Sequence, residues 1–238
     1  MINTYVAFDL ETTGLNVETE NIIEIGALKV VEGKVVDRFI EFVKPDQEIS
    51  PLVSNLTGIT NEMVNSARPT EEIIGDFVKF CGEEILVGHN VMFDYKFSKK
   101  YASMYGYPFE KQGIDTLKIA RKVHKDMESK SLGALCDHYG IVNNAAHRAY
   151  HDALATAKIY HMMAHYFEEG NEALFRPQNL LYKPSKIQPA TKKQIVFLES
   201  LLECHHITCE KELTEMTRSE ASKMIDHIIL QYGKGYVR

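Results

Sequence analysis

The chain contains no apolar run of the length that a membrane-spanning helix needs. It also shows no basic N-terminal segment followed by an apolar stretch, the pattern of a secretory signal. Its four cysteines are scattered along 238 residues, which argues against a disulfide framework and fits a reducing compartment. We therefore expect a cytoplasmic protein that does not associate with a membrane.

The chain also lacks an excess of positive charge. Its formal net charge is −6, which argues against broad electrostatic capture of nucleic acid. The charge is uneven, because from residue 183 onward nine Lys or Arg face seven Asp or Glu, whereas the preceding part is strongly acidic. An acidic domain can still act on phosphates if bound metal ions neutralise its site.

Hydrophobic periodicity and turn signals predict an α/β protein. Strands are predicted at residues 5–11, 21–31 and 34–43, with a hairpin turn at 32–33, and short buried strands at 85–88 and 114–116. Helices are predicted at 51–56, 61–64, 70–81, 91–105, from 117, 131–139 and 150–167, with Thr70 as an N-cap. Antiparallel strands followed by strand–helix alternation indicate a mixed central sheet with its site at strand ends.

A change in composition after residue 175 divides the chain. Residues 176–190 contain three prolines among polar and basic neighbours and predict a linker. Two amphipathic helices, each capped by a threonine, are predicted at 191–203 and 217–231. The predicted organisation is a main domain (1–175), a linker (176–190) and a small helix–loop–helix module (191–238).

Two carboxylates share one face of the first predicted strand. Asp9 and Glu11 alternate with Phe8 and Leu10, so their side chains point to the same side. They repel each other unless a cation lies between them, and hard oxygen ligands suit Mg²⁺ or Mn²⁺. The spacing alone is a weak signal, because residues 126–128 repeat it in a polar run that predicts a solvated loop.

Two further acids and a histidine stand near predicted helix starts. Asp94 lies in the first turn of its helix, where the helix dipole favours an acid in any case. On a continuous helix His147 and Asp152 would lie about 140° apart, so they converge only if His147 precedes the helix on a loop. Alternatively, His147 is an ordinary surface histidine on a loop. The spacing between histidine and aspartate discriminates little, because His89 stands at the same spacing before Asp94.

Together, three segments resemble the motifs of the DEDDh family of 3′–5′ exonucleases: Asp-Leu-Glu-Thr-Thr-Gly at 9–14, His-Asn-x-x-Phe-Asp at 89–94 and His-Arg-Ala-x-x-Asp-Ala at 147–153. The likeness is greatest to the proofreading exonucleases of bacterial replicative DNA polymerases, either a separate epsilon subunit or a domain within the Gram-positive polymerase. It covers roughly residues 1–170.

The resemblance implies a ribonuclease H-like fold and a two-metal site. Asp9, Glu11, Asp94 and Asp152 match the four carboxylates that bind two divalent ions, Mg²⁺ or Mn²⁺, and His147 matches the general base. Phosphodiester hydrolysis needs an activated water and a stabilised leaving oxygen, which two ions about 3.5–4 Å apart supply. A histidine, with an ordinary pKa of about 6.5, suits the proton transfer.

Six residues are candidate contacts for the terminal nucleotide by the same resemblance: Thr12, Thr13, Leu15, Ile59, Asn90 and Phe93. Core packing is an equally good interpretation for Ile59 and Phe93. Asn90 bridges the helix start and the substrate, or else caps the helix.

The sequence thus predicts a metal-dependent 3′–5′ exonuclease that releases 5′-mononucleotides from single-stranded or frayed 3′ ends of DNA. An RNA-trimming enzyme remains an alternative, because only the fit around the 2′-hydroxyl differs. A second alternative is an accessory protein of a DNA polymerase that acts mainly by binding. In the linker and the C-terminal module, Lys183, Lys186, Lys192 and Lys193 are candidates to follow a phosphate backbone. Alternatively, the helix pair docks on the nuclease domain or on a partner protein.

Overall fold

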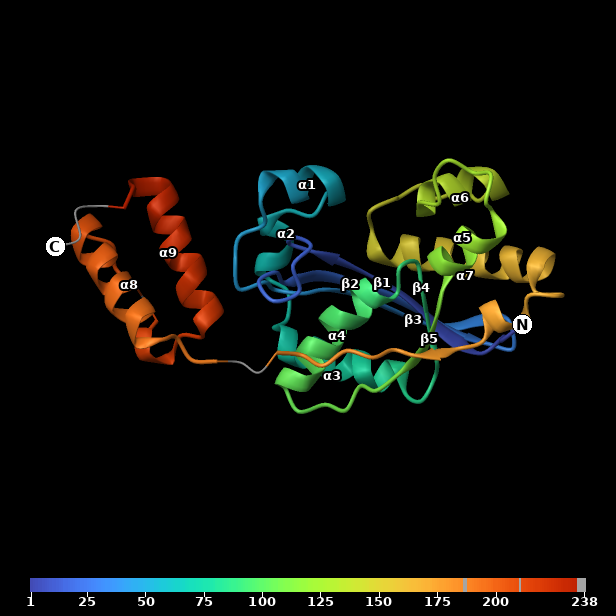
Figure 1. The fold of residues 1–238 in the computed structure, drawn as a ribbon, viewed down its shortest axis with the longest axis horizontal. Helices are drawn as coiled ribbons and strands as arrows, with labels where there is room; N and C mark the ends of the chain where they lie inside the picture. The colour runs from blue at the N-terminus through green and yellow to red at the C-terminus, as the bar shows by residue number, and fades with distance from the viewer. Residues whose placement is uncertain (186–187, 210, 235–238) are drawn as a thin grey trace. The chain divides into compact units, whose positions relative to one another are not determined.

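The structure is a computed structural model that describes residues 1–185, 188–209 and 211–234. The chain divides into two compact units, Met1–Pro184 and Ser185–Arg238 (Figure 1). Lys186, one of the lysines predicted to follow a phosphate backbone, lies outside the described residues. Within the described part, no helix has the length and apolar character needed to cross a membrane.

The first unit is built around a six-stranded sheet in the order β3-β2-β1-β4-β5-β6. The strands are β1 (Tyr5–Thr12), β2 (Ile22–Val31), β3 (Lys34–Phe42), β4 (Leu86–Gly88), β5 (Gln112–Asp115) and β6 (Gln178–Asn179). β1, β2 and β3 pair antiparallel, β4 runs parallel to β1 and to β5, and β6 returns antiparallel to β5. The predicted mixed sheet is confirmed.

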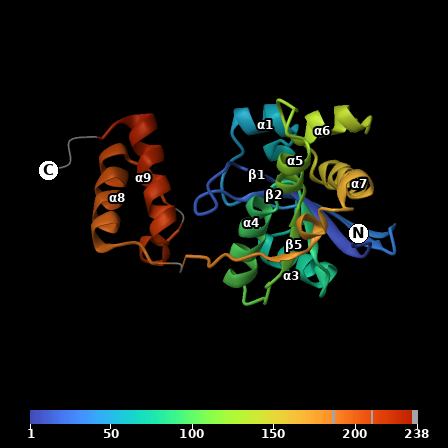
Figure 2. The ribbon, with the colours of Figure 1, turned by 45° about the vertical axis from the view of Figure 1, so that its right-hand side comes forward.

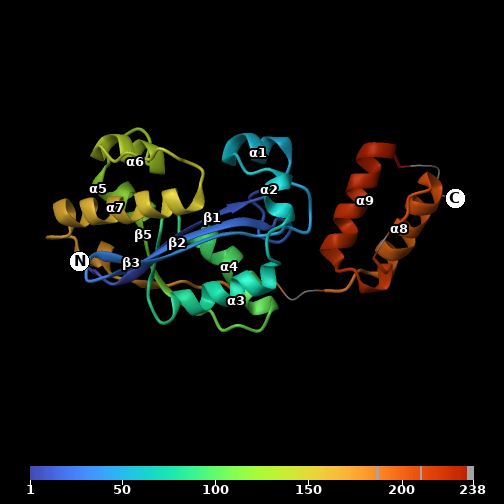
Figure 3. The same ribbon diagram turned by 180° about the vertical axis from the view of Figure 1, so that it is seen from behind.

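Helices cover both faces of this sheet. They are α1 (Pro51–Thr57), α2 (Asn61–Asn65), α3 (Thr70–Cys81), α4 (Met92–Met104), α5 (Thr116–Val123), α6 (Leu132–Tyr139), α7 (Ala149–Phe167) and the 3₁₀ turn η1 (Glu172–Phe175). α3 and α4 lie on one face, and α5, α6 and α7 on the other (Figures 1 and 3). One prediction was wrong by one residue: Pro69, not Thr70, occupies the N-cap of α3.

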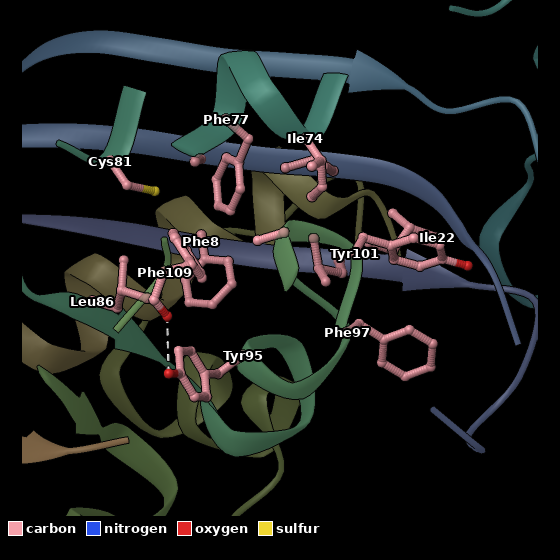
Figure 4. Close-up of a cluster of buried hydrophobic side chains, with 14 of the residues drawn as sticks. Phe8, Ile22, Ile74, Phe77, Cys81, Leu86, Tyr95, Phe97, Tyr101 and Phe109 are labelled. Atoms are coloured by element: carbon pink, nitrogen blue, oxygen red, sulfur yellow. Dashed lines mark hydrogen bonds between the residues drawn. The ribbon is translucent and has the colours of Figure 1, made fainter. Parts of the chain in front are cut away.

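Two apolar cores enclose the sheet, and the alternation along β1 divides its side chains between them. Val6, Phe8 and Leu10 face the core under α3 and α4, where Phe8 packs near Phe77 (Figure 4). Tyr95 is buried in this core and donates a hydrogen bond of 3.0 Å from its hydroxyl to the Phe109 carbonyl. Because side chains alternate along a strand, Asp9 and Glu11 face the opposite layer, where α7 lies.

The segment after residue 175 starts as part of the first unit. Gln178 and Asn179 extend the sheet as β6, and Leu180 is buried in the core beneath α4. Figure 2 shows this segment running past β5 as an extended strap. The boundary between the two compact units falls after Pro184, so the first half of the proposed linker packs on the sheet domain.

The second unit is a helix pair with its own small core. α8 (Lys192–His205) and α9 (Arg218–Tyr232) pack through buried residues that include Leu198, Leu201 and Ile228, and the short turn η2 (Leu213–Glu215) precedes α9. Each helix begins with a capping box, in which Thr191 or Thr217 accepts from the third residue of its helix. The two predicted threonine caps are therefore confirmed.

Candidate active site

Three carboxylates meet where β1 faces the start of α7. One oxygen each of Asp9, Glu11 and Asp152 lies within 4.8 Å of the others, a spacing at which a single metal ion could be held. Asp9 and Glu11 come from alternate positions of β1, and Asp152 comes from the first turn of α7. Residues 143 positions apart in the chain thus form one acidic cluster.

Small residues let α7 approach the sheet closely enough to bring Asp152 to β1. Gly26 is the register partner of Asp9 on β2, and a Cβ at this glycine would lie only 1.9 Å from the backbone nitrogen of Tyr150. Ala149 and Ala153 are fully buried on the same side of the helix. Small residues on the helix and a glycine on the strand together allow this close packing.

Asp94 supplies a fourth carboxylate from the first turn of α4. One of its oxygens accepts a 3.1 Å hydrogen bond from the backbone N–H of Leu10, which lies between Asp9 and Glu11 on β1. Asp94 is 3% exposed, and its charge is the second-largest cause, after burial, of the raised pKa of Asp9. The fold therefore brings the four acids proposed as metal ligands to one end of β1.

Burial and mutual repulsion raise the pKa values of these acids. Burial is the largest cause for each of them, and it lifts the pKa of Asp9 and of Asp94 well above the usual range. Burial, Asp152 and Glu24 together raise the pKa of Glu11 to about 8. The pKa of Asp152 is raised less strongly, because two hydrogen bonds to its carboxylate oppose the effect of burial.

This donor set fits hard divalent cations. Four carboxylates offer oxygen ligands of the kind that Mg²⁺ and Mn²⁺ prefer, and a cation at their centre would relieve the repulsion that raises their pKa values. The geometry defines a candidate metal site without fixing which ion occupies it.

His147 lies before α7, on the loop that the sequence predicted. Its side chain is exposed, its backbone has φ of +63°, and its N–H donates a 2.8 Å hydrogen bond to Oδ2 of Asp152. Asn143 donates from Nδ2 to Oδ1 of the same carboxylate at 2.7 Å. Both oxygens of Asp152 are thus tied to the loop that carries the histidine.

The sequence did not predict a role for two residues beside the site, Glu24 and Asn143. Glu24 on β2 is the register partner of Glu11, and it receives hydrogen bonds from the guanidinium of Arg148 and from the N–H of Ala149. Asn143 fixes Asp152, as described above. An acid inside the apolar run 21–31 was the available signal for Glu24, whereas no local pattern marks Asn143.

The two threonines of the first motif are engaged within the protein. The Thr13 hydroxyl donates to Glu20 at 2.6 Å and accepts from the Asn21 N–H and from Gln47, which uses the one donor and two acceptor positions of a hydroxyl. The Thr12 hydroxyl donates to the Gly14 carbonyl at 2.7 Å. Thr13 therefore stabilises the loop after β1, and the contact proposed between its hydroxyl and a nucleotide would have to replace one of these bonds.

The remaining candidate contacts differ in exposure. Leu15 is 85% exposed at the tip of the loop after β1, and Phe93 is half-buried at the start of α4. Ile59 is 0% exposed and packs with Ile23 and Ile49, so its side chain serves the core. Asn90 is exposed with φ of +68° and forms no side-chain cap on α4, which removes the capping alternative.

Comparison with known proteins agrees with this geometry. The sequence profile of the RNase_T exonuclease family matches residues 6–160, and the chain belongs to this family of exonuclease enzymes. It is 39% identical over 158 residues to the DNA polymerase III subunit epsilon of Aquifex aeolicus, covering 66% of this chain and 78% of that protein. It is 40% identical over 158 residues to the PolC-type DNA polymerase III of Thermotoga petrophila, covering 66% of this chain but only 12% of that polymerase.

Solved structures support the fold. The structure of exonuclease X in complex with 5′-overhanging duplex DNA aligns with a TM-score of 0.57 and 27% identity, over 68% of this chain and 92% of that one. The E. coli ExoI–ssDNA complex aligns with a TM-score of 0.65 over 73% of this chain and 43% of that chain. At 18% identity, the second likeness shows the fold alone, and the predicted ribonuclease H-like architecture is confirmed.

Proposed function

We propose that the protein is a metal-dependent 3′–5′ exonuclease that removes 5′-mononucleotides from DNA. The observation that carries the proposal is the convergence of Asp9, Glu11 and Asp152 within 4.8 Å, with Asp94 bonded to the backbone between the first two. The exposed His147 lies on the loop before α7, and its backbone N–H donates a hydrogen bond to Asp152. This set provides metal ligands and a base for phosphodiester hydrolysis.

Each residue of the site has a distinct task in this proposal. Asp9, Glu11, Asp94 and Asp152 would hold two divalent ions, which when bound supply an activated water and charge stabilisation at the leaving 3′-oxygen. His147 accepts the proton of the attacking water at its imidazole nitrogen. Asn143 holds the Asp152 carboxylate in place, and the loop anchored by Thr13 presents the exposed Leu15 to the substrate.

DNA is the proposed substrate because relatives point to it. The similar subunit and polymerase are named as parts of DNA polymerase III, and the aligned exonucleases were solved with DNA. On the same basis we propose single-stranded or frayed 3′ ends as the bound form, a polymerase subunit as a partner, and a cytoplasmic location. The PolC-type relatives are about eight times longer than the matched part, so their other activities carry no weight here.

A cleavage assay tests the proposal. Matched 5′-labelled DNA and RNA single strands are incubated with Mg²⁺, with Mn²⁺ and with a chelator, beside the variant Asp9→Ala. A metal-dependent ladder that shortens from the 3′ end, and that the variant does not produce, is the expected result. A faster reaction on RNA would instead support the RNA-trimming alternative, and no cleavage of either strand by folded protein with metal would favour the accessory-binding alternative.

A further inference from the structure

The loop that carries His147 is held on its far side by an ion pair between the buried Glu24 and the partly exposed Arg148. We propose that Glu24 and Arg148 are positioning residues, which fix the His147 loop against the metal carboxylates without binding metal or substrate themselves. The inference rests on the proposed function, because it assigns these residues a part in the same reaction.

The contact between the two side chains is specific in its geometry. The Arg148 guanidinium donates from Nη2 to Oε1 of Glu24 at 2.8 Å, and its Nε lies 3.2 Å from both carboxylate oxygens. The guanidinium also lies over the ring of Phe42, 5.3 Å from its centroid. Such a planar, multiply bonded contact fixes the direction of an arginine side chain as a single charge–charge contact does not.

The same carboxylate also fixes the start of α7. Oε2 of Glu24 accepts a 3.0 Å hydrogen bond from the backbone N–H of Ala149, the first residue of the helix. One buried acid on β2 thus holds both the side chain of residue 148 and the backbone of residue 149. The loop end is attached to the sheet at the strand position opposite Glu11.

His147 lies between two anchors. On one side, Asp152 accepts from its N–H and from Asn143, and on the other side Glu24 holds the next residue, Arg148. Its backbone adopts φ of +63°, a left-handed conformation that residues other than glycine seldom adopt without support. The two anchors together fix this backbone conformation, and they thereby fix the direction in which the imidazole projects from the backbone.

Stability alone gives little reason for this pair. Glu24 is 1% exposed within a strand that is otherwise apolar over most of its length. Taking the Glu24 carboxylate out of water is costly, and an ion pair with a buried member commonly stabilises a fold no better than apolar residues of similar volume would. A role in placing the His147 loop explains why the strand keeps an acid at this position.

Two kinds of variant separate positioning from stability. Arg148→Met leaves Glu24 charged and unpaired, which threatens folding. The double variant Glu24→Gln/Arg148→Met removes both charges and keeps an amide oxygen that can accept from the Ala149 N–H. Arg68→Met is the matched control, because Arg68 forms an ion pair of 2.9 Å with Asp76 elsewhere on the domain surface.

Three readouts are taken on the full chain: kcat and KM on a single-stranded oligonucleotide, Mn²⁺ affinity by calorimetry, and amide hydrogen exchange over residues 143–149. For the double variant we expect kcat to fall by about 10- to 100-fold, since small misplacements of a reacting group have effects of this size. KM and Mn²⁺ affinity should stay close to wild type, while exchange at 143–149 becomes faster. Arg148→Lys, which keeps the charge but loses the planar contact, should give an intermediate kcat.

The outcomes are decisive in each direction. A double variant with wild-type kcat overturns the inference, and so does a lower kcat with unchanged exchange. A lower kcat that comes with weaker Mn²⁺ binding also overturns it, because the pair would then support the metal ligands instead. A wild-type protein that does not cleave overturns the proposed function and this inference with it, whereas an active wild type confines any failure to the inference.

Discussion

Two loop–helix junctions of this protein share a His-x-x-x-x-Asp spacing but use it differently. At the first junction, His89 precedes Asp94, and at the second His147 precedes Asp152. His89 is half-buried, with Nδ1 3.0 Å from the Thr116 hydroxyl, and burial lowers its pKa. His147 is exposed beside the acidic cluster.

The position of one left-handed residue accounts for the difference. At the first junction Asn90 has φ of +68°, so the residue after the histidine is presented to solvent. At the second junction the histidine itself has φ of +63°. Both aspartates place a carboxylate near the end of β1, Asp94 through its hydrogen bond to the Leu10 N–H and Asp152 within the acidic cluster, but of the two histidines only His147 is exposed.

The largest expected effect is a loss of kcat on replacing either Asp94 or Asp152, and it tests whether the two aspartates have the same role. Asp94→Asn and Asp152→Asn should each lower kcat by at least about 10³-fold, because a ligand of the metal site is worth several kcal/mol in the transition state. Steady-state kinetics at saturating Mg²⁺ measures the loss, with Asp126→Asn on an exposed loop as the control. An Asp94→Asn enzyme that keeps a tenth of wild-type kcat would show that the two positions are not equivalent.

The next effect tests the contrast between the histidines. His147→Asn should reduce kcat by about 10²- to 10⁴-fold, the usual range for loss of a general base, and asparagine tolerates the left-handed backbone at this position. His89→Asn should leave kcat nearly unchanged and lower the Tm, since the lost hydrogen bond contributes about 0.5–1.5 kcal/mol. Equal losses of kcat in the two variants would contradict the assignment of the base.

The smallest effect concerns stability rather than turnover. The pKa of Glu11 rises from 4.5 to about 8 on folding, so between these pH values the folded state binds more protons than the unfolded state. The free energy of unfolding of the metal-free protein should therefore fall as pH rises through this window, by about 1.4 kcal/mol per unit of pKa shift at most. Below pH 4.5 this contribution is absent.

Urea unfolding in a chelator, compared with Glu11→Gln, measures this contribution together with the repulsion that Glu11 exerts on Asp9 and Asp94, because titrating groups away from the cluster are common to both proteins. Wild type should match the variant near pH 4.5 and be less stable than it at pH 8. Added Mn²⁺ should stabilise wild type more than the variant at pH 8. A wild-type protein that gains stability relative to the variant as pH rises would contradict the repulsive acidic cluster.

Local patterns predicted most of the fold and only part of the site. Period-two alternation placed Asp9 and Glu11 on one face of β1, and the caps at Thr191 and Thr217 followed from side-chain chemistry that acts within one turn. The role of Asn143 was not predicted, because its hydrogen bond to Asp152 depends on the path of the loop between them. The strap around Leu180 looked like a linker because two residues of strand pairing at a sheet edge leave almost no periodic signal.

The sequence by itself determined the strands and helices, the order of the acidic residues and the likeness to the exonuclease family, since these depend on side-chain type and spacing along the chain. The tertiary structure decided which residues meet. It brought Asp152 to Asp9 through the close approach of α7 to Gly26, and it turned His147 outward while His89 turned inward. Such choices depend on backbone dihedrals and on contacts between distant segments, which spacing in the sequence does not encode.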